Sequence, residues 1–162
     1  MKKSQMKKPL VLGVGNSWRG DDGVGPVVVD TLRHQRAKNF ETLCVAGDPL
    51  ELLDLWEDRS LVVLVDSYCA ERGENGIKEW QQIGGVLQLP FVTGGFSSHM
   101  FGLAETIELG CSLDRLPPKM LLLALPGDSY QVGKKLSSRA QALVEQAGRR
   151  VLEFLKAEGD YA

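Results

Sequence analysis

The sequence predicts an α/β protein, a three-layer α/β/α sandwich around a mostly parallel twisted sheet of about five strands. Two observations predict this fold. Short apolar segments alternate along the chain with longer segments of helical periodicity. The most apolar segment, residues 60–66, is rich in β-branched side chains and has no polar alternation, which is typical of a strand buried on both faces. The length of 162 residues suits a single domain, residues 1–162, with one core.

The elements are expected in regular order. Strands are predicted over residues 10–14, 40–45, 60–66, 77–82 and 120–125, the fourth of them at an edge and the fifth ended by Pro126 and Gly127. Helices are predicted over residues 23–36, 50–57, 98–109 and 137–156, the third stopped by Gly110. Residues 84–98 contain two glycine pairs and a proline, and we expect a loop there with at most one short strand.

Composition and charge argue against several classes of protein. The chain has 19 basic and 21 acidic residues and a net charge of -2, whereas a general nucleic-acid binder needs a strongly basic face. Three cysteines without a CxxC pair predict reduced thiols in the cytoplasm. No apolar stretch approaches the length of a membrane-spanning helix. We therefore expect a cytoplasmic protein with no nucleic-acid or membrane partner, and a flexible basic tail over residues 1–8.

Polar residues follow the predicted strands at their carboxyl ends, where open parallel α/β sheets bind ligands. Asp22 comes after the first strand, Asp66 ends the central strand, and His99 opens the third helix. Two carboxylates and an imidazole can bind a divalent ion such as zinc or nickel and leave one position open for water or substrate. The three residues come from distant segments, so their spacing alone does not identify the site.

Each of these residues also has a structural explanation. Asp21 and Asp22 precede a predicted helix, where an acidic side chain that caps the free amide groups contributes about 0.5–2 kcal/mol. Asp66 can simply end its strand or cap a turn, and a lone histidine such as His99 at a helix start is often solvated. The residues by themselves leave both explanations open.

Glycine motifs for nucleotide binding fit poorly. Residues 13–18 follow a strand as a dinucleotide fingerprint does, but Trp18 occupies the place of the third glycine. Residues 127–135 resemble a phosphate loop, yet five residues separate the two glycines and Lys135 replaces the required Ser or Thr. The chain has no Gly-x-Ser-x-Gly elbow of a serine hydrolase. A non-catalytic module that binds a nucleotide or a metal is the alternative from another class.

Four segments, in order, resemble the hydrogenase maturation protease family. Residues 12–25 read Leu-Gly-Val-Gly-Asn-Ser-Trp-Arg-Gly-Asp-Asp-Gly-Val-Gly and resemble the N-terminal motif of that family. Leu-Val-Asp-Ser at 64–67 is similar to its strand-end aspartate, and Ser-His-Met-Phe-Gly-Leu at 98–103 to its histidine before a Gly-Leu helix. Pro126 followed by residues 133–137 resembles its C-terminal pattern. The resemblance extends over nearly the whole chain.

The resemblance implies an endopeptidase that removes the C-terminal extension of a nickel-iron hydrogenase large-subunit precursor after nickel insertion. It implies that Asp22, Asp66 and His99 are both the metal-binding and the catalytic residues, with individual roles left open. The metal would be nickel presented by the substrate, and no organic cofactor is implied. The family expectation is a monomer. Hydrolysis would use either a metal-activated water or a carboxylate as general base.

The segment after the second strand departs from the family pattern. Relatives often carry Asp-Gly-Gly-Thr there, whereas this chain has Val-Ala-Gly-Asp at 45–48 followed by proline. We expect Asn16, Gly47 and Asp48 to contact the substrate, so the departure concerns which hydrogenase is processed. Asp48 and Glu51 also have the spacing of a capping box. Peptidyl-tRNA hydrolases share the Gly-Asn turn, but the Thr-Arg-His-Asn segment that they need is absent.

Overall fold

The computed structural model describes residues 6–35, 39–83, 86–87 and 98–158, with the backbone alone for residues 83, 86–87 and 98–101. The described strands form one six-stranded sheet in the order β2-β1-β3-β6-β4-β5. Their bounds are β1 Leu10–Val14, β2 Glu41–Val45, β3 Leu61–Cys69, β4 Lys78–Ile83, β5 Val86–Leu87 and β6 Lys119–Gly127. β2, β1, β3 and β6 are parallel, and β4 and β5 join in antiparallel pairing. This confirms the predicted mostly parallel α/β fold, with a two-residue strand added at one edge.

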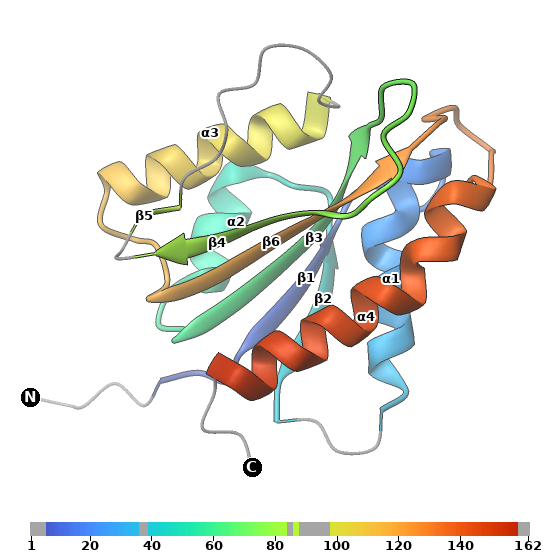
Figure 1. The fold of residues 1–162 in the computed structure, drawn as a ribbon. Helices are drawn as coiled ribbons and strands as arrows, with labels where there is room; N and C mark the ends of the chain where they lie inside the picture. The colour runs from blue at the N-terminus through green and yellow to red at the C-terminus, as the bar shows by residue number, and fades with distance from the viewer. Residues whose placement is uncertain (1–5, 36–38, 84–85, 88–97, 159–162) are drawn as a thin grey trace, which may run out of the picture.

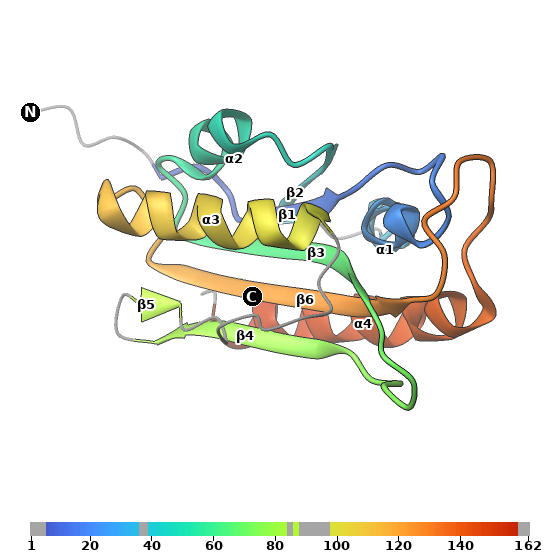
Figure 2. The same cartoon turned by 90° about the horizontal axis from the view of Figure 1, so that it is seen from above.

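Helices cover both faces of the sheet, as Figures 1 and 2 show. The short helix η1 (Gly20–Gly23) leads into α1 (Val24–Arg33), and α1 packs with α4 (Ser138–Glu158) on one face. α2 (Pro49–Trp56) and α3 (Ser98–Ser112) cover the other face. Each face has its own cluster of buried side chains, which is the expected result for strands that are apolar on both sides. Along β3, Val63 and Val65 pack in the α1–α4 cluster, whereas Leu64 and Tyr68 pack in the α2–α3 cluster.

Three predicted boundaries were wrong because tertiary contacts override local signals. β3 and β6 pair continuously from Leu61 opposite Lys119 to Cys69 opposite Gly127, so β3 extends past Asp66 and β6 includes the Pro126 and Gly127 that were expected to follow it. α3 continues through Gly110 to Ser112. A Cβ on Gly110 would lie 2.8 Å from Leu116 Cδ2 and 3.2 Å from Leu53 Cδ2, so this glycine permits close packing and does not stop the helix.

The fourth predicted strand is present as β4, but it lies between β6 and the short β5 and is not itself the last strand. Most of the predicted loop 84–98 lies outside the described residues. At the N-terminus, residues 1–5 of the expected tail also lie outside them, whereas the Lys7 amide donates to the Asp58 carbonyl at 3.0 Å and the Arg59 guanidinium donates to the Lys8 carbonyl at 2.6 Å. Among the described residues, no helix combines the length and the apolar character that crossing a membrane requires.

The first strand and the first helix approach each other at two glycines. A Cβ on Gly25 would lie 2.4 Å from the Val65 carbonyl oxygen and 2.6 Å from the Val14 carbonyl oxygen. A Cβ on Gly13 would lie 2.6 Å from the Gly25 carbonyl oxygen. These backbone contacts leave no room for a side chain, so the Gly-rich motif brings the start of α1 directly against the carboxyl ends of β1 and β3.

Candidate functional site

The carboxyl ends of the parallel strands form the rim on which the predicted site residues were expected to lie. The β1–β3 ladder ends with Gly13 opposite Val65, so Asp66 is the first residue of β3 beyond that ladder. On its other side, Asp66 pairs with Ala124 of β6. One structural explanation was that Asp66 simply ends its strand. Asp66 instead lies inside β3, at the position just beyond the last residue of β3 that pairs with β1.

The Asp66 carboxyl group is fully buried. Its Oδ1 accepts a hydrogen bond from the Ser67 amide at 2.7 Å, whereas its buried Oδ2 has no hydrogen-bond partner among the described residues. Burial raises the pKa of Asp66 to about 8, and the nearby Asp22 carboxylate adds to the rise, although the Ser67 amide opposes it. An incompletely bonded carboxyl group in the interior is costly to the fold, so its presence calls for a functional explanation.

Asp22 lies in η1 and is likewise fully buried. Its Oδ2 accepts a hydrogen bond from the Asn16 amide at 3.1 Å. The turn that brings these residues together depends on Gly15, which has φ of +131° and whose Cβ would lie 1.9 Å from the Asp22 carbonyl oxygen. The glycine thus allows the β1–α1 turn to fold back so that Asp22 lies near the end of β3, where its charge acts on Asp66.

Neither aspartate of the Asp21-Asp22 pair caps α1 by a side-chain hydrogen bond, because the residue at that position is Gly23. Asp21 instead binds the loop between β6 and α4. Its Oδ2 accepts from the Asp128 amide at 2.6 Å and the Ser129 amide at 3.2 Å, and its Oδ1 accepts from the Ser137 amide at 2.6 Å. The two adjacent carboxylates therefore have different surroundings, and Asp21 holds two loops together.

Replacing Asp21 by Asn is expected to lower the free energy of unfolding by about 2–4 kcal/mol, because the new amide group would face a backbone N–H where an oxygen now accepts a charge-assisted bond. Urea unfolding would measure the loss. Asp128→Asn is the matched control, since the Asp128 side chain is 44% exposed and pairs with Arg139 at 3.3 Å. A control change within about 1 kcal/mol is expected, and equal losses for the two variants would contradict the special role of Asp21.

His99 lies in the first turn of α3, and its side chain is outside the described residues. The start of α3 lies near the carboxyl ends of β1 and β3 in both Figures 1 and 2. By the alternation of side chains along β3, Asp66 belongs to the sheet face that α2 and α3 cover. The described side chains, which do not include that of His99, contain no group of three or more His, Cys, Asp or Glu that could bind a metal. The three-ligand set therefore stays a prediction.

The predicted substrate-contacting residues lie at the same rim. The Asn16 Oδ1 accepts from the Trp18 amide at 2.9 Å, and the Gly15 amide donates to the Val45 carbonyl at 2.9 Å, which ties the ends of β1 and β2 together. The Asp48 Oδ1 accepts from the Glu51 amide at 3.0 Å, so the predicted capping bond at the start of α2 is confirmed. Gly47 precedes it with φ of +97°. Substrate contact by Asn16, Gly47 and Asp48 remains a prediction.

Tyr130 is a rim residue that the sequence reasoning missed. It follows β6 closely, and a Cβ on Gly127 would lie 2.6 Å from the Tyr130 hydroxyl oxygen. Burial raises the pKa of this hydroxyl above its usual value, and the nearby Asp66 and Asp21 carboxylates contribute to the rise. The rule that located Asp66, namely that functional side chains follow the carboxyl ends of parallel strands, also applies to the residues after β6.

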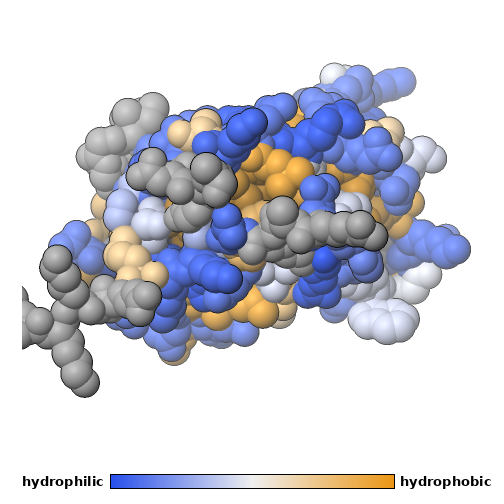
Figure 3. Space-filling model, turned by 90° about the horizontal axis from the view of Figure 1, so that it is seen from below, coloured by the Kyte–Doolittle hydropathy of each residue, from blue (hydrophilic) through white to orange (hydrophobic). Residues whose placement is uncertain are grey.

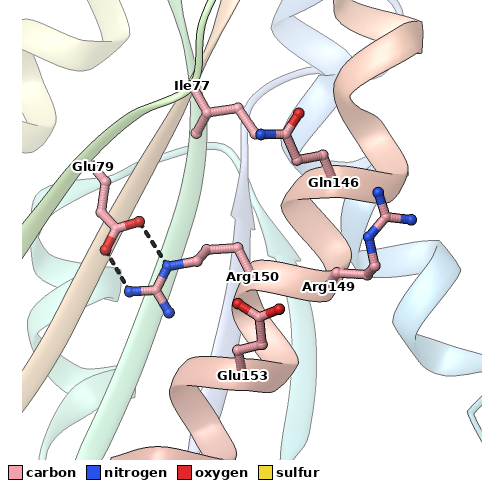
Figure 4. Close-up of a pocket in the computed structure, with 6 residues that line it drawn as sticks. All are labelled: Ile77, Glu79, Gln146, Arg149, Arg150 and Glu153. Atoms are coloured by element: carbon pink, nitrogen blue, oxygen red, sulfur yellow. Dashed lines mark hydrogen bonds and ion pairs between the residues drawn. The ribbon is translucent and has the colours of Figure 1, made fainter.

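A separate hollow of about 320 Å³ lies between β4 and α4. Figure 4 shows that Glu79 of β4 and Arg150 of α4 point toward each other across it, with two hydrogen bonds of 2.8 and 2.5 Å. None of the residues that line this hollow lies at the carboxyl ends of the parallel strands. Figure 3 shows the molecule from below, where hydrophobic residues are visible between hydrophilic ones. We therefore place the candidate site at the carboxyl rim.

The fold and this rim define an α/β protein with two buried carboxylates, from the β1–α1 turn and from β3, at the carboxyl ends of a parallel sheet. No family model matches the chain. The chain is 26% identical over 152 residues to the hydrogenase 2 maturation protease of Escherichia coli (strain K12), and the match covers 93% of this chain and 92% of that protein.

Solved structures give the same result at the level of fold. The hydrogenase maturating endopeptidase HybD from E. coli superposes with a TM-score of 0.76 at 23% identity, covering 94% of both chains. The [NiFe] hydrogenase maturation protease HybD from Thermococcus kodakarensis superposes with a TM-score of 0.70 at 19% identity, covering 91% of this chain and 98% of that one. Together with the sequence match, these findings show that the chain is similar in sequence to a hydrogenase maturation protease and shares the fold of such proteins over nearly its whole length.

Proposed function

We propose that the protein is an endopeptidase that removes the C-terminal extension of a nickel-iron hydrogenase large-subunit precursor after nickel insertion, which completes maturation of that enzyme. The observation that carries this proposal is the fully buried Asp66, whose Oδ2 has no hydrogen bond among the described residues, beside Asp22 in a chain similar over nearly its whole length to a maturation protease. Such a carboxyl pair favours chemistry at a cation or at a polarised peptide bond.

Nickel enters this proposal as part of the substrate. Asp22, Asp66 and His99 contact the nickel that the precursor presents, which checks metal loading and positions the scissile bond. The buried Oδ2 of Asp66 supports this assignment, because a cation would supply the missing partner for that oxygen. Two carboxylates and one imidazole without a thiolate make a modest site for nickel, which suits contact with a metal held mainly by another protein. No organic cofactor is required.

Two residues of the chain have defined roles at this site: Asn16 orients Asp22, and Asp66 holds a proton. The Asn16 amide fixes the orientation of Asp22 through the 3.1 Å bond to its Oδ2. Asp66 keeps its proton near neutral pH until a cation or a developing positive charge approaches. Nickel held by the precursor at these residues would supply polarisation of the scissile carbonyl or a lower pKa of the attacking water. A carboxylate that accepts the proton of the water is the alternative route to the same hydrolysis.

The partner is the large-subunit precursor, met in the cytoplasm by a monomeric protease. Three cysteines that form no disulfide among the described residues support a reducing compartment. Asn16, Gly47 and Asp48 contact the precursor at the rim. The precursor of the same organism is therefore the substrate to use in an assay.

The direct test incubates the protein with a nickel-loaded or nickel-free precursor and follows the precursor C-terminus by intact mass. We expect loss of one defined C-terminal peptide only from the nickel-loaded precursor, and no loss with Asp22→Asn or His99→Ala. Cleavage of the nickel-free precursor would remove the metal check and keep the protease. An uncut, correctly loaded precursor would overturn the proposed function.

Binding of Ni²⁺ alone is expected to be weak and to strengthen with pH up to about 8, because the cation must displace the proton of Asp66. The expected gain is about tenfold from pH 6 to pH 7 and becomes smaller as the pH approaches 8. Calorimetric titration in two buffers with different ionisation heats would show release of about one proton at pH 7. Binding without proton release in the wild type would contradict this account, and Asp66→Asn should make the pH dependence weaker, with the contribution of the histidine contact retained.

A further inference from the structure

Two exposed apolar side chains lie on the two loops beside the candidate site. Trp18, in the β1–α1 turn, is 78% exposed, and Val132, in the β6–α4 loop, is 79% exposed. The two lie next to each other, because the Gly133 amide donates to the Trp18 carbonyl at 2.8 Å. Tryptophan is highly buried on average, and an exposed tryptophan beside another exposed apolar side chain is a feature of protein contact sites.

Both loops are held firmly in place. The Gly20 amide donates to the Lys134 carbonyl at 3.1 Å, and the Asp21 amide donates to the Ser129 carbonyl at 2.8 Å. The buried Asp21 carboxylate accepts three further hydrogen bonds from backbone amides of the same loop. In Figures 1 and 2 the β1–α1 turn and the β6–α4 loop run side by side at the end of the sheet where the strands terminate. The apolar side chains are thus presented on a preorganised base, which lowers the entropy cost of binding a partner.

The charges around this surface indicate the kind of partner. Lys134 and Lys135 are exposed next to Val132, and among the described residues neither ammonium group has a carboxylate within ion-pair distance. The chain as a whole has a net charge of -2, so this is a local concentration of positive charge. A complementary surface has an apolar centre bordered by acidic side chains.

The surface is also continuous with the candidate site. The Trp18 amide donates to the Asn16 Oδ1 at 2.9 Å, and the Asn16 amide donates to the Asp22 Oδ2 at 3.1 Å. A protein that covers Trp18 therefore lies within two residues of the group that orients Asp22. The rim positions predicted for substrate contact, Asn16, Gly47 and Asp48, did not include this surface.

We propose that Trp18, Val132, Lys134 and Lys135, here called the Trp18 surface, dock the folded body of the precursor through an apolar patch bordered by acidic residues, and that this contact selects which precursor is processed. The inference rests on the proposed function. The Trp18 surface acts by holding the partner, and its side chains take no part in the hydrolysis.

The experiment compares Trp18→Ser, Val132→Asp and the double variant Lys134→Glu/Lys135→Glu with the wild type. The nickel-loaded precursor of the same organism is the probe, and both its Kd and the kcat and KM of cleavage are measured. We expect the Kd and KM to rise about 10- to 100-fold, kcat to stay within about threefold, and Tm and Ni²⁺ binding to be unchanged. The association rate of the wild type should fall with salt, and that of the lysine variant should fall less.

Leu113→Asp is the matched control, because Leu113 is 52% exposed just beyond the end of α3 and far from the rim. Equal Kd values for Val132→Asp and Leu113→Asp would overturn the docking surface. A wild-type dimer in sedimentation that Trp18→Ser converts to a monomer would also overturn it, because the occupant would then be a second copy of the chain. A wild type that binds the precursor without cutting it would overturn the proposed function alone, and the Kd ratios would still test the surface.

Discussion

Replacement of Asp66 by Asn is expected to lower the rate of precursor cleavage by about 10²- to 10⁴-fold and to stabilise the folded protein at pH 8. The amide retains an oxygen that accepts the 2.7 Å bond from the Ser67 amide, so the backbone geometry of β3 is preserved. It has no proton to transfer and is a poor ligand for a cation. Loss of activity with a gain of stability would show that this side chain is retained for its chemistry.

The stability part of this prediction follows from the direction of the pKa shift. Burial raises the pKa of Asp66 from 3.8 to about 8 in the folded chain. Between these two pH values the unfolded chain has released the proton and the folded chain has kept it, so the free energy of unfolding falls as pH rises. The contribution is fully present below about pH 4 and is lost as pH rises through about 8. The Asn variant lacks this loss, and we expect its advantage at pH 8 to be about 2–4 kcal/mol.

Thermal unfolding between pH 5 and pH 8 would measure the effect. The Tm difference between Asp66→Asn and the wild type should grow with pH and reach about 4–10 °C at pH 8. Asp30→Asn is a suitable control, because Asp30 is exposed and, within the part of the chain that the structure describes, forms its ion pair with Arg33 on the surface of α1 at 2.9 Å. A Tm difference that shrinks with pH would contradict the raised pKa, and full activity of Asp66→Asn would remove this residue from the site.

Replacement of Gly25 by Ala is expected to lower the free energy of unfolding by about 3 kcal/mol or more. The added Cβ would lie 2.4 Å from the Val65 carbonyl oxygen and 2.6 Å from the Val14 carbonyl oxygen. Both neighbours are backbone atoms of central strands and cannot rotate away. The higher helix propensity of alanine offsets only about 1 kcal/mol of this cost.

Gly76→Ala is the matched control, because nothing lies within 4 Å of the Cβ that it would gain. Its change should stay within about 0.5 kcal/mol in the same urea titration. Similar midpoints for Gly25→Ala and Gly76→Ala would show that α1 has room to move away from the sheet. In that case close packing of α1 against the sheet would not explain why the motif is rich in glycine.

The layers of the fold were predictable because buried parallel strands and amphipathic helices leave strong local patterns. β3 shows where this information ends. Its apolar run stops at Asp66, yet the strand continues to Cys69 because β6 supplies a backbone partner as far as Gly127. The prediction that Gly110 ends α3 was also wrong. Glycine often ends a helix, but here the close packing of Leu53 and Leu116 requires a glycine inside the helix. In each case the deciding contact comes from another part of the chain.

The site was predictable to the same extent. The strand-end rule placed Asp22 and Asp66 near each other, and the structure buries both. It could not separate Asp21 from Asp22, because adjacent identical side chains differ only in the partners that tertiary structure brings to them. The partners of Asp21 are amides of the β6–α4 loop, and the amide partner of Asp22 is that of Asn16. In the sequence analysis, Trp18 was noted only because it occupies the place of the third glycine of a nucleotide-binding motif. Its exposure could not be predicted from the sequence.

The hydrogen bonds of the Asp21 carboxylate have a consequence for folding during synthesis on the ribosome. Its three amide partners lie 107, 108 and 116 residues further along the chain. While the chain is synthesised, the β1–α1 turn emerges long before the loop that fixes it. The candidate site is therefore completed only when residue 137 has left the exit tunnel. A nascent chain stalled earlier contains both Asp22 and Asp66 but lacks the bonds that bring the turn and the last loop together, so we expect it to be inactive.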